Sequence, residues 1–253
     1  MINRARPLLG TIVSIRVEGM EAGVRAAFAA IESVHRLMSP HSEIGDLVQI
    51  NRQGHRRSVR VHPWTFEVLR CAHAVSDASD GAFDITLRRL GASHRDILLL
   101  PGKRVRLRRP AQLDLGGLAK GFAVDRAVDA LRRFGARSGS VNAGGDLRVF
   151  GDLPQTVRVR LPGAPSLAAR LFEVREQSLA TSGSYFGSLQ EDPRNGRELC
   201  SDYSVTVCAP TCMLADALTK AVAALGPQPG LLGHFGAHAY LVDGSGRVHA
   251  TRG

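Results

Sequence analysis

The amino-acid sequence predicts a protein of the α+β class. Four stretches are predicted to form helices, and they mix with runs of adjacent strand-like segments without strict strand–helix–strand alternation. The chain has 253 residues, of which 44% are hydrophobic, and is long enough to bury a substantial core. No internal repeat, low-complexity tract or linker divides the sequence. We therefore expect one domain over residues 1–253.

Hydrophobic spacing and turn residues predict the elements of the N-terminal half. Residues 11–17 alternate as a strand does, and the apolar residues of 21–38 recur every three or four positions, as in a helix. Residues 38–51 form a polar loop or a short helix, and 64–79 predict a second helix that Gly81 ends. The runs "ILLL" and "RVRLR" predict a hairpin around "PGK".

The C-terminal half begins with a glycine turn between two predicted elements. In "LDLGGLAKGFAVDRAVDAL" (113–131), a short apolar strand leads through two glycines into a helix that reaches about Phe134. Residues 211–225 predict the last long helix, with Thr211 as its N-cap, and a Gly/Pro-rich turn follows it. The remaining strands are expected at "GSVNAGGDLRVFG", "TVRVRL", "RLFEVR", "YSVTVCA", "AHAYLVD" and "GRVHATR".

Charge and composition argue against several classes of protein. The net charge of +10 comes from 33 basic and 23 acidic residues, but the arginine-rich pieces are scattered and aromatic residues make up only 5%. This pattern favours a basic solvated surface over a nucleic-acid groove. No apolar run approaches the roughly 20 residues of a membrane span. Pro7 and Gly10 interrupt the N-terminal apolar stretch and no cleavage site follows, so we expect a cytoplasmic protein with no signal peptide. The four cysteines form no C-x-x-C pair and are expected to be free thiols.

The glycine turn is the first candidate binding element. Gly116 and Gly117 leave backbone N–H groups unobstructed, and the following helix would direct its N-terminal dipole at an anion. Lys120 in the first turn could reach a phosphate. The stretch matches neither the Walker pattern nor G-x-G-x-x-G, so a tight turn with an ordinary surface lysine is the alternative.

A carboxylate inside an apolar helix is the second candidate. Asp216 is flanked by alanine and leucine, and its burial is costly unless it is paired or binds a cation. Thr219 and Lys220 follow at three and four residues and share its helix face. The spacing permits either an Asp216–Lys220 pair on an exposed stripe or a magnesium site built from hard oxygen ligands.

Three shorter pieces have polar residues at the ends of apolar runs. The sequence "NAGGD" predicts a hairpin turn at Gly144 and Gly145, which would also let a ligand approach the backbone. "GAFDIT" and "ATSG", taken alone, are typical of caps or turns. No nucleophile–base set, G-x-S-x-G or H-E-x-x-H motif is found.

Taken together and in order, these pieces resemble the ApbE family, the FAD:protein FMN transferases. The resemblance rests on "LLGTIVSIRV", "MSPHSEIGDLVQIN", "GAFDIT", "DLGGLAKGFAVD", "NAGGD", "ATSG" and "SVTVCAPTCMLADAL", over about residues 5–226. It implies an α+β fold with mixed or antiparallel sheets packed by helices, and a cleft for FAD. It also implies a magnesium-dependent reaction that splits FAD, attaches FMN to a threonine of an acceptor protein and releases AMP.

The resemblance also assigns roles by position. Asp216 and Lys120 would be catalytic, and magnesium would be held by Asp216 and the carbonyl of Ala119, with Thr219 as a substitute ligand. Gly116, Gly117 and Lys120 would face the phosphates. The other residues expected to line the cofactor cleft are Leu9, Gly10, Thr11, Ser39, Ser42, Asn51, Asp84, Thr86, Thr181, Ser182 and Gly183.

Some positions depart from the family pattern. Leu189 stands in "SLQEDPRNG" where the family has a histidine implicated in transfer, and Asn195 replaces a threonine. Lys220 occupies the position of a threonine and could pair with Asp216 and weaken the metal site. The alternative function is therefore an FAD-binding protein or FAD pyrophosphatase with impaired transfer.

Overall fold

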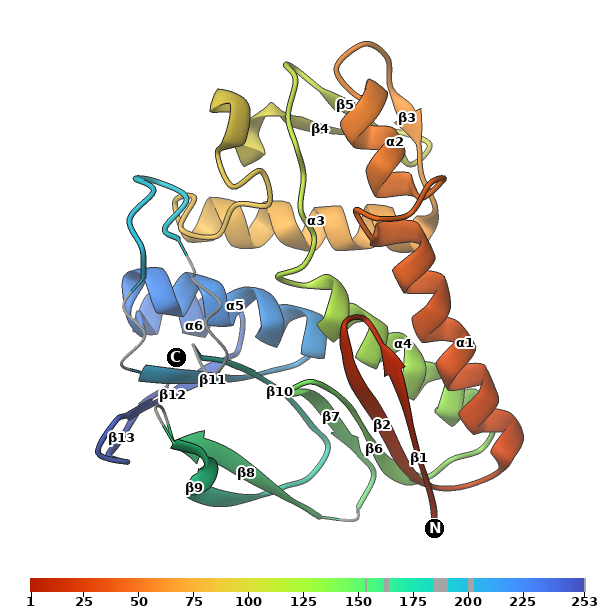
Figure 1. Ribbon diagram of the computed structural model, residues 1–253, viewed down its shortest axis with the longest axis vertical. Coiled ribbons are helices and arrows are strands. Elements are labelled where there is room, and N and C mark those ends of the chain that lie inside the picture. Colours follow the sequence, from red (N-terminus) through yellow and green to blue (C-terminus); the bar gives the residue numbers. More distant parts are fainter. Residues whose placement is uncertain (153, 162–163, 184–190, 200–202, 253) are drawn as a thin grey trace.

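A large antiparallel sheet forms the base of the molecule. The computed structural model describes all residues except 153, 162–163, 184–190, 200–202 and 253 (Figure 1). The sheet has eight strands in the order β1-β2-β6-β7-β10-β11-β12-β13, and every neighbouring pair is antiparallel. The strands are β1 (Ile2–Leu8), β2 (Thr11–Glu18), β6 (Ser138–Ala143), β7 (Asp146–Phe150), β10 (Gln177–Ser182), β11 (Tyr203–Ala209), β12 (His238–Asp243) and β13 (Val248–Arg252).

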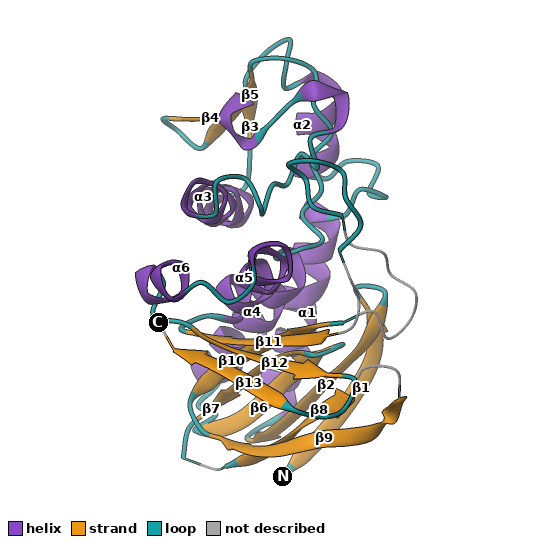
Figure 2. Ribbon diagram, turned by 90° about the vertical axis from the view of Figure 1, so that its left-hand side faces the viewer, coloured by secondary structure: helices purple, strands orange, loops and turns teal. Residues whose placement is uncertain are grey.

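Two smaller sheets accompany the large one. Strands β3 (Val59–Arg60), β5 (Arg104–Leu107) and β4 (Ile97–Leu100) form one of them. Strands β8 (Gln155–Leu161) and β9 (Ala164–Val174) form a hairpin. In Figure 2 this hairpin lies on the side of the large sheet away from the helices, where Val174 and Val149 belong to a second, small hydrophobic cluster.

Helices cover the other face of the large sheet in layers. Figure 2 shows α4 (Ala119–Arg133), α5 (Cys212–Leu225) and part of α1 (Glu21–Met38) next to the sheet. Helix α3 (Pro63–Ala78) lies beyond them, and α2 (Asp46–Gln53) and the three-stranded sheet are farthest from the large sheet. The remaining helix is α6 (Pro229–His234), and η1 (Arg89–Gly91) and η2 (His94–Asp96) are short 3-10 turns.

The core lies between the large sheet and these helices. Alternate residues of β2, Val13, Ile15 and Val17, are fully buried, as expected for a strand with one apolar face. They share one hydrophobic cluster with Phe28 of α1 and Phe122 of α4. This shared core holds the N-terminus of α4 in a fixed position above the sheet.

The structure confirms the α+β class and most of the expected elements. The predicted helices over 21–38, 64–79 and 211–225 correspond to α1, α3 and α5, and the predicted "PGK" hairpin corresponds to β4–β5. Three expectations were wrong or incomplete. Residues 2–8 form an additional strand, part of the Gly/Pro-rich turn after α5 is the short helix α6, and residues 113–115 pair with none of the described strands. In the described part of the chain, no helix has the length and apolarity needed to cross a membrane.

Candidate functional site

Two hairpin turns lie next to each other at one end of the large sheet. Leu9 and Gly10 form the two-residue turn of the β1–β2 hairpin, both with positive φ, and Gly144 and Gly145 form the corresponding β6–β7 turn. Strands β2 and β6 are paired, so these two turns are neighbours. A Cβ at Gly144 would stand 2.5 Å from Oγ1 of Thr11, and only glycine fits there.

The segment before α4 is held by side chains instead of by a strand. Asn51 of α2 accepts a hydrogen bond from the Leu113 amide at 2.8 Å and donates one to the Leu113 carbonyl at 3.0 Å. The amide of Asp114 donates to the carbonyl of Ile85. The side chain of Asp114 accepts the Gly116 amide at 2.7 Å, so this predicted phosphate donor is already engaged. These contacts fix the path of the glycine turn.

Helices α4 and α5 meet at very close range. A Cβ at Gly121 would stand 2.3 Å from the carbonyl oxygen of Cys212, so the backbones touch at this point. Asp125, one turn later in α4, accepts the amides of Cys212 and Met213 at 3.0 and 2.9 Å. Its carboxylate also accepts a hydrogen bond from Arg148 of β7 at 2.6 Å. Asp125 therefore caps the first turn of α5 from a neighbouring helix.

A cluster of two carboxylates and two ammonium groups lies where α4, α5 and the β6–β7 turn meet. Lys120 donates to Asp146 at 2.5 Å, and its ammonium lies 3.6 Å from Oδ2 of Asp216. Lys220 donates to the other oxygen of Asp216, one helical turn earlier. The Gly121 amide donates to Oδ2 of Asp216 at 3.3 Å. We refer to Lys120, Asp146, Asp216 and Lys220 as the charged cluster.

Because the charged cluster is largely buried, its charges interact strongly and shift the pKa values of Asp146, Asp216 and Lys120. Burial, with the Asp216 carboxylate nearby, raises the pKa of Asp146 to about 6, although both lysines oppose this shift. Burial also acts to raise the pKa of Asp216, but the ammonium groups of Lys220 and Lys120 outweigh it and hold the pKa below its usual value. The pKa of Lys120 lies above its ordinary value, because the two carboxylates outweigh its desolvation. At neutral pH the cluster thus carries two negative and two positive charges.

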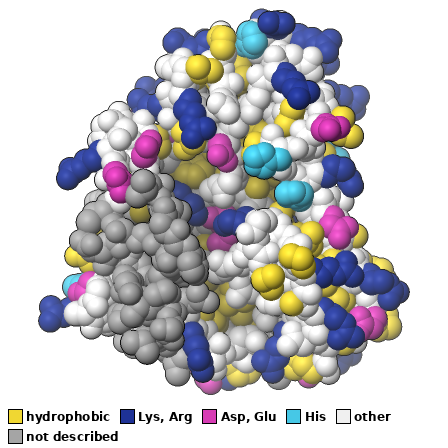
Figure 3. Space-filling model, viewed as in Figure 1, with side chains coloured by type: hydrophobic (Ala, Val, Ile, Leu, Met, Phe, Trp, Pro, Cys, Tyr) yellow, Lys and Arg dark blue, Asp and Glu magenta, His cyan; other side chains and the backbone are white. Residues whose placement is uncertain are grey.

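The charged cluster is accessible from one face of the molecule. The side chains of Lys120 and Lys220 are 33% and 25% exposed, whereas that of Asp216 is fully buried. Figure 3 shows a hollow in the middle of one face of the molecule, where acidic and basic side chains lie next to each other. An anionic ligand entering from solvent would therefore meet the ammonium groups before the carboxylates.

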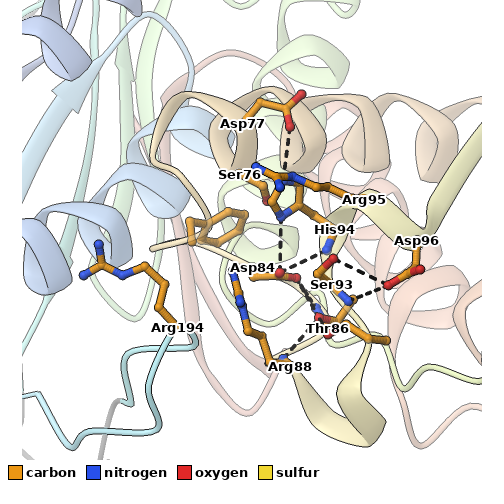
Figure 4. A network of polar contacts seen from close by, with 12 residues as sticks. Ser76, Asp77, Asp84, Thr86, Arg88, Ser93, His94, Arg95, Asp96 and Arg194 are labelled. Carbon is orange, nitrogen blue, oxygen red and sulfur yellow. Dashed lines mark hydrogen bonds and ion pairs between the residues drawn. The ribbon is translucent and has the colours of Figure 1, made fainter.

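Asp84 and Thr86, two residues expected to line the cofactor cleft, hold a buried loop in place (Figure 4). One oxygen of Asp84 accepts the amide and hydroxyl of Thr86 at 2.9 and 2.8 Å. The other oxygen accepts the His94 amide at 3.0 Å and lies 3.3 Å from Nδ1 of that ring. On its far side, His94 approaches Asp77 of α3 at 3.1 Å. A role in cofactor binding stays a prediction for both residues.

The structure also places the other predicted cleft residues. Ser39 and Ser42, in the loop after α1, accept the amides of His41 and Gly45. Thr181 lies on β10, and its hydroxyl shares a hydrogen bond with that of Thr206 on β11. The next residues along the chain, Ser182 and Gly183, are buried and half-buried respectively. Leu189 lies outside the described residues, and Asn195 bonds within its own tight turn around Asp192.

The predicted metal ligands are only partly brought together. Ala119 begins α4, two residues before Gly121, whose amide donates to Asp216. Thr219 is fully buried, and its hydroxyl donates to the Asp216 backbone carbonyl at 2.7 Å instead of facing the carboxylate. The Asp216–Lys220 pair does form, but not on an exposed stripe, because the Asp216 carboxylate is completely buried.

The sequence did not predict the positions of two buried carboxylates near the site. Asp146 ends the "NAGGD" motif, for which a hairpin turn was predicted, yet it is the closest partner of Lys120. Asp125 was overlooked, although it lies in an apolar stretch of a helix as Asp216 does. That shared signal, a carboxylate among alanine, valine and leucine at helical spacing, could have identified Asp125.

The fold and the site define an α+β protein with a charge-balanced cluster beside a glycine turn at a helix N-terminus. The profile of the ApbE family matches residues 9–97 and 92–233. The chain is 26% identical to the FAD:protein FMN transferase of Klebsiella pneumoniae (strain 342), over 83% of this chain and 78% of that protein. It is 27% identical to the FAD:protein FMN transferase of Rhodobacter capsulatus, covering 96% of this chain but only 56% of that protein.

Solved structures show the same fold. The ApbE protein of Thermotoga maritima superposes with a TM-score of 0.87 at 24% identity, over 99% of this chain and 96% of that one. The flavin transferase ApbE of Vibrio cholerae gives a TM-score of 0.84 at 20% identity, over 99% and 96%. The chain belongs to the ApbE family.

Proposed function

We propose that this protein is an FAD:protein FMN transferase. It cleaves the pyrophosphate of FAD, attaches FMN through its phosphate to a threonine hydroxyl of an acceptor protein, and releases AMP. The observation that carries the proposal is the charged cluster beside the Gly116–Gly117 turn in a chain of the ApbE family. The curated relatives named above, which are FAD:protein FMN transferases, support it.

The lysines are the groups best suited to bind the pyrophosphate. An ammonium group has three N–H donors. Among the described residues, the contacts of Lys120 to Asp146 and Asp216 use two of them, and the contact of Lys220 to Asp216 uses one. Donors therefore remain on both lysines for phosphate oxygens. Their positive charge would stabilise the negative charge that grows on the pyrophosphate as its P–O bond breaks.

The acceptor hydroxyl would attack the phosphorus atom of the FMN half. The new bond joins that phosphorus to the threonine oxygen, the bond to the bridging oxygen breaks, and AMP leaves with that oxygen. The proton of the hydroxyl is released to solvent or to a base of the complex. Positioning the pyrophosphate against fixed charges is the contribution that the described residues make to this step.

The resemblance further implies magnesium at Asp216, with Ala119 and Thr219 as additional ligands. The arrangement of the side chains does not fit such an ion. Lys220 binds one carboxylate oxygen of Asp216, and the Gly121 amide and Lys120 face the other. The Thr219 hydroxyl points to a backbone carbonyl. We therefore assign no step of the reaction to a bound metal.

The proposal is tested with purified protein, FAD and a lysate of cells from which its gene has been deleted. We expect AMP to be released and a lysate protein to acquire flavin fluorescence that survives a denaturing gel. Tandem mass spectrometry should place FMN on a threonine of that protein. Release of AMP and free FMN without an adduct would indicate an FAD pyrophosphatase instead, and unchanged FAD would refute both functions.

A further inference from the structure

Lysine is rare in this chain, and its distribution points to the charged cluster. Of the 33 basic residues only three are lysines, Lys103, Lys120 and Lys220, and the rest are arginines. Two of these three lysines, Lys120 and Lys220, contact the same buried carboxylate, that of Asp216. An ammonium is a compact point charge, whereas a guanidinium is a broad planar fork. The cluster thus uses the basic group that most resembles a small cation in size and charge density.

The position of Lys220 places that charge at the glycine turn. Its stem passes the turn closely, since a Cβ at Gly117 would stand 3.7 Å from Cε of Lys220. Its ammonium binds Oδ1 of Asp216, and 25% of the side chain remains exposed to solvent. The ammonium is therefore held by a buried carboxylate, while part of the side chain remains open to solvent.

The charged cluster is already neutral with this lysine in place. Asp146 and Asp216 contribute two negative charges, and Lys120 and Lys220 contribute two positive charges. Without Lys220 the buried site would hold one excess negative charge, which a cation must balance because uncompensated buried charge is costly. With Lys220, a divalent ion would instead bring two excess positive charges and would have to displace an ammonium tethered one helical turn away.

We propose that the ammonium of Lys220 takes the place of a divalent cation in this site, binding the FAD pyrophosphate directly so that FAD binding and cleavage are independent of magnesium. The proposal rests on the proposed function in taking FAD as the ligand. The competing explanation is that the Lys220–Asp216 pair only stabilises α5.

The first experiment uses the unmodified protein and a metal probe. Mn²⁺ is titrated into the apo protein and followed by electron paramagnetic resonance, which distinguishes free from bound ion. We expect Mn²⁺ to stay free, and FAD affinity, measured by flavin fluorescence, to be the same in EDTA and in millimolar Mg²⁺. Binding of Mn²⁺ at an equivalent per chain, or an FAD affinity that requires Mg²⁺, would overturn the proposal.

The second experiment changes the lysine. In Lys220→Met we expect Mn²⁺ binding to appear, FAD affinity in EDTA to fall by about tenfold or more, and Mg²⁺ to restore part of it. Lys103→Met, which removes the exposed lysine of the β4–β5 turn, is the matched control and should change neither quantity. If Lys220→Met unfolds at a lower temperature but keeps the Mn²⁺ and FAD behaviour of the parent, the pair is only structural.

The outcomes separate this inference from the proposed function. AMP release that is abolished by EDTA and restored by Mg²⁺ would overturn the inference and leave the proposed function intact. FAD that binds without metal but is never cleaved, with or without Mg²⁺, would refute the proposed function and leave intact the inference that Lys220 replaces a divalent cation in FAD binding. Should Lys220→Met fail to fold, Lys220→Gln and the unmodified protein supply the same comparison.

Discussion

Replacement of Asp125 by alanine should destabilise the protein strongly. The Asp125 carboxylate is buried and holds three partners, the Cys212 and Met213 amides and the Arg148 guanidinium. Its removal leaves two amides of the first turn of α5 without their acceptor and an arginine whose side chain is only 16% exposed without its counter-charge. Breaking a buried ion pair costs about 3–5 kcal/mol.

Thermal and urea unfolding measure this cost. For a chain of this size, 1 kcal/mol corresponds to a shift of about 2–4 °C in Tm, so we expect Tm to fall by about 6–20 °C. Asp125→Asn keeps an acceptor oxygen and should lose less, about 1–3 kcal/mol. Because Asp125 fixes α5 against α4, FAD affinity should also fall at temperatures where the variant is folded.

A half-buried aspartate on the same helix provides the control. Asp129 of α4 pairs with Arg126 at 2.9 Å, and its side chain is 32% exposed. Asp129→Ala should cost less than about 1 kcal/mol, as partly solvated pairs do. If Asp125→Ala is no more destabilising than Asp129→Ala, the contacts of Asp125 with α5 and Arg148 do not contribute substantially to the free energy of unfolding.

Three further predictions concern the surroundings of the charged cluster. Gly121→Ala would put a methyl group 2.3 Å from the backbone of α5 and should cost at least about 1–3 kcal/mol in urea unfolding, whereas Gly230→Ala, with open space around it, should be close to neutral. Asn51→Ala removes both hydrogen bonds to Leu113 and should lower the free energy of unfolding by about 1–3 kcal/mol and weaken FAD binding; an unchanged FAD affinity would show that the glycine turn needs no such support. The pKa of Asp146 is raised from 3.8 to about 6. Between about pH 4 and 6 the folded protein therefore keeps a proton that the unfolded chain loses. The free energy of unfolding should fall by about 2–3 kcal/mol as pH rises through this window. Asp146→Asn should flatten that slope, and a slope equal to that of the parent would contradict the assignment.

The helices were predictable from the sequence because their spacing is regular. The helices over 21–38 and 211–225 have apolar residues on one face and clear boundaries, such as the Thr211 cap, which accepts the Leu214 amide. Local pattern could not identify β1, because all of its central residues are exposed. Nor could it show that residues 113–115 lack a strand partner, since the groups that bond Leu113 belong to Asn51, 62 positions away.

The candidate site was predictable in its parts but not in its assembly. The i, i+4 spacing predicted the Asp216–Lys220 pair but is compatible with an exposed or a buried position, and only the packing of α4 on α5 decides between them. The charge balance depends on Asp146, which follows a glycine turn and gives no local sign of its partner 26 positions away. Asp146 therefore belongs to the charged cluster only because the packing of distant segments brings Lys120 next to it.

The charged cluster is proposed to bind FAD and to promote its cleavage, so that FMN is transferred to a protein. The most direct measurement is the rate of AMP release from FAD, with detection of FMN–threonine on an acceptor by mass spectrometry, for the parent protein and for Lys120→Met. We expect AMP and adduct in equal amounts from the parent, and a loss of about 100-fold or more in Lys120→Met, since removing one charge-stabilising donor typically costs about 10²–10³ in rate. FAD that remains intact with the parent protein, or a Lys120→Met variant as active as the parent, would contradict this proposal.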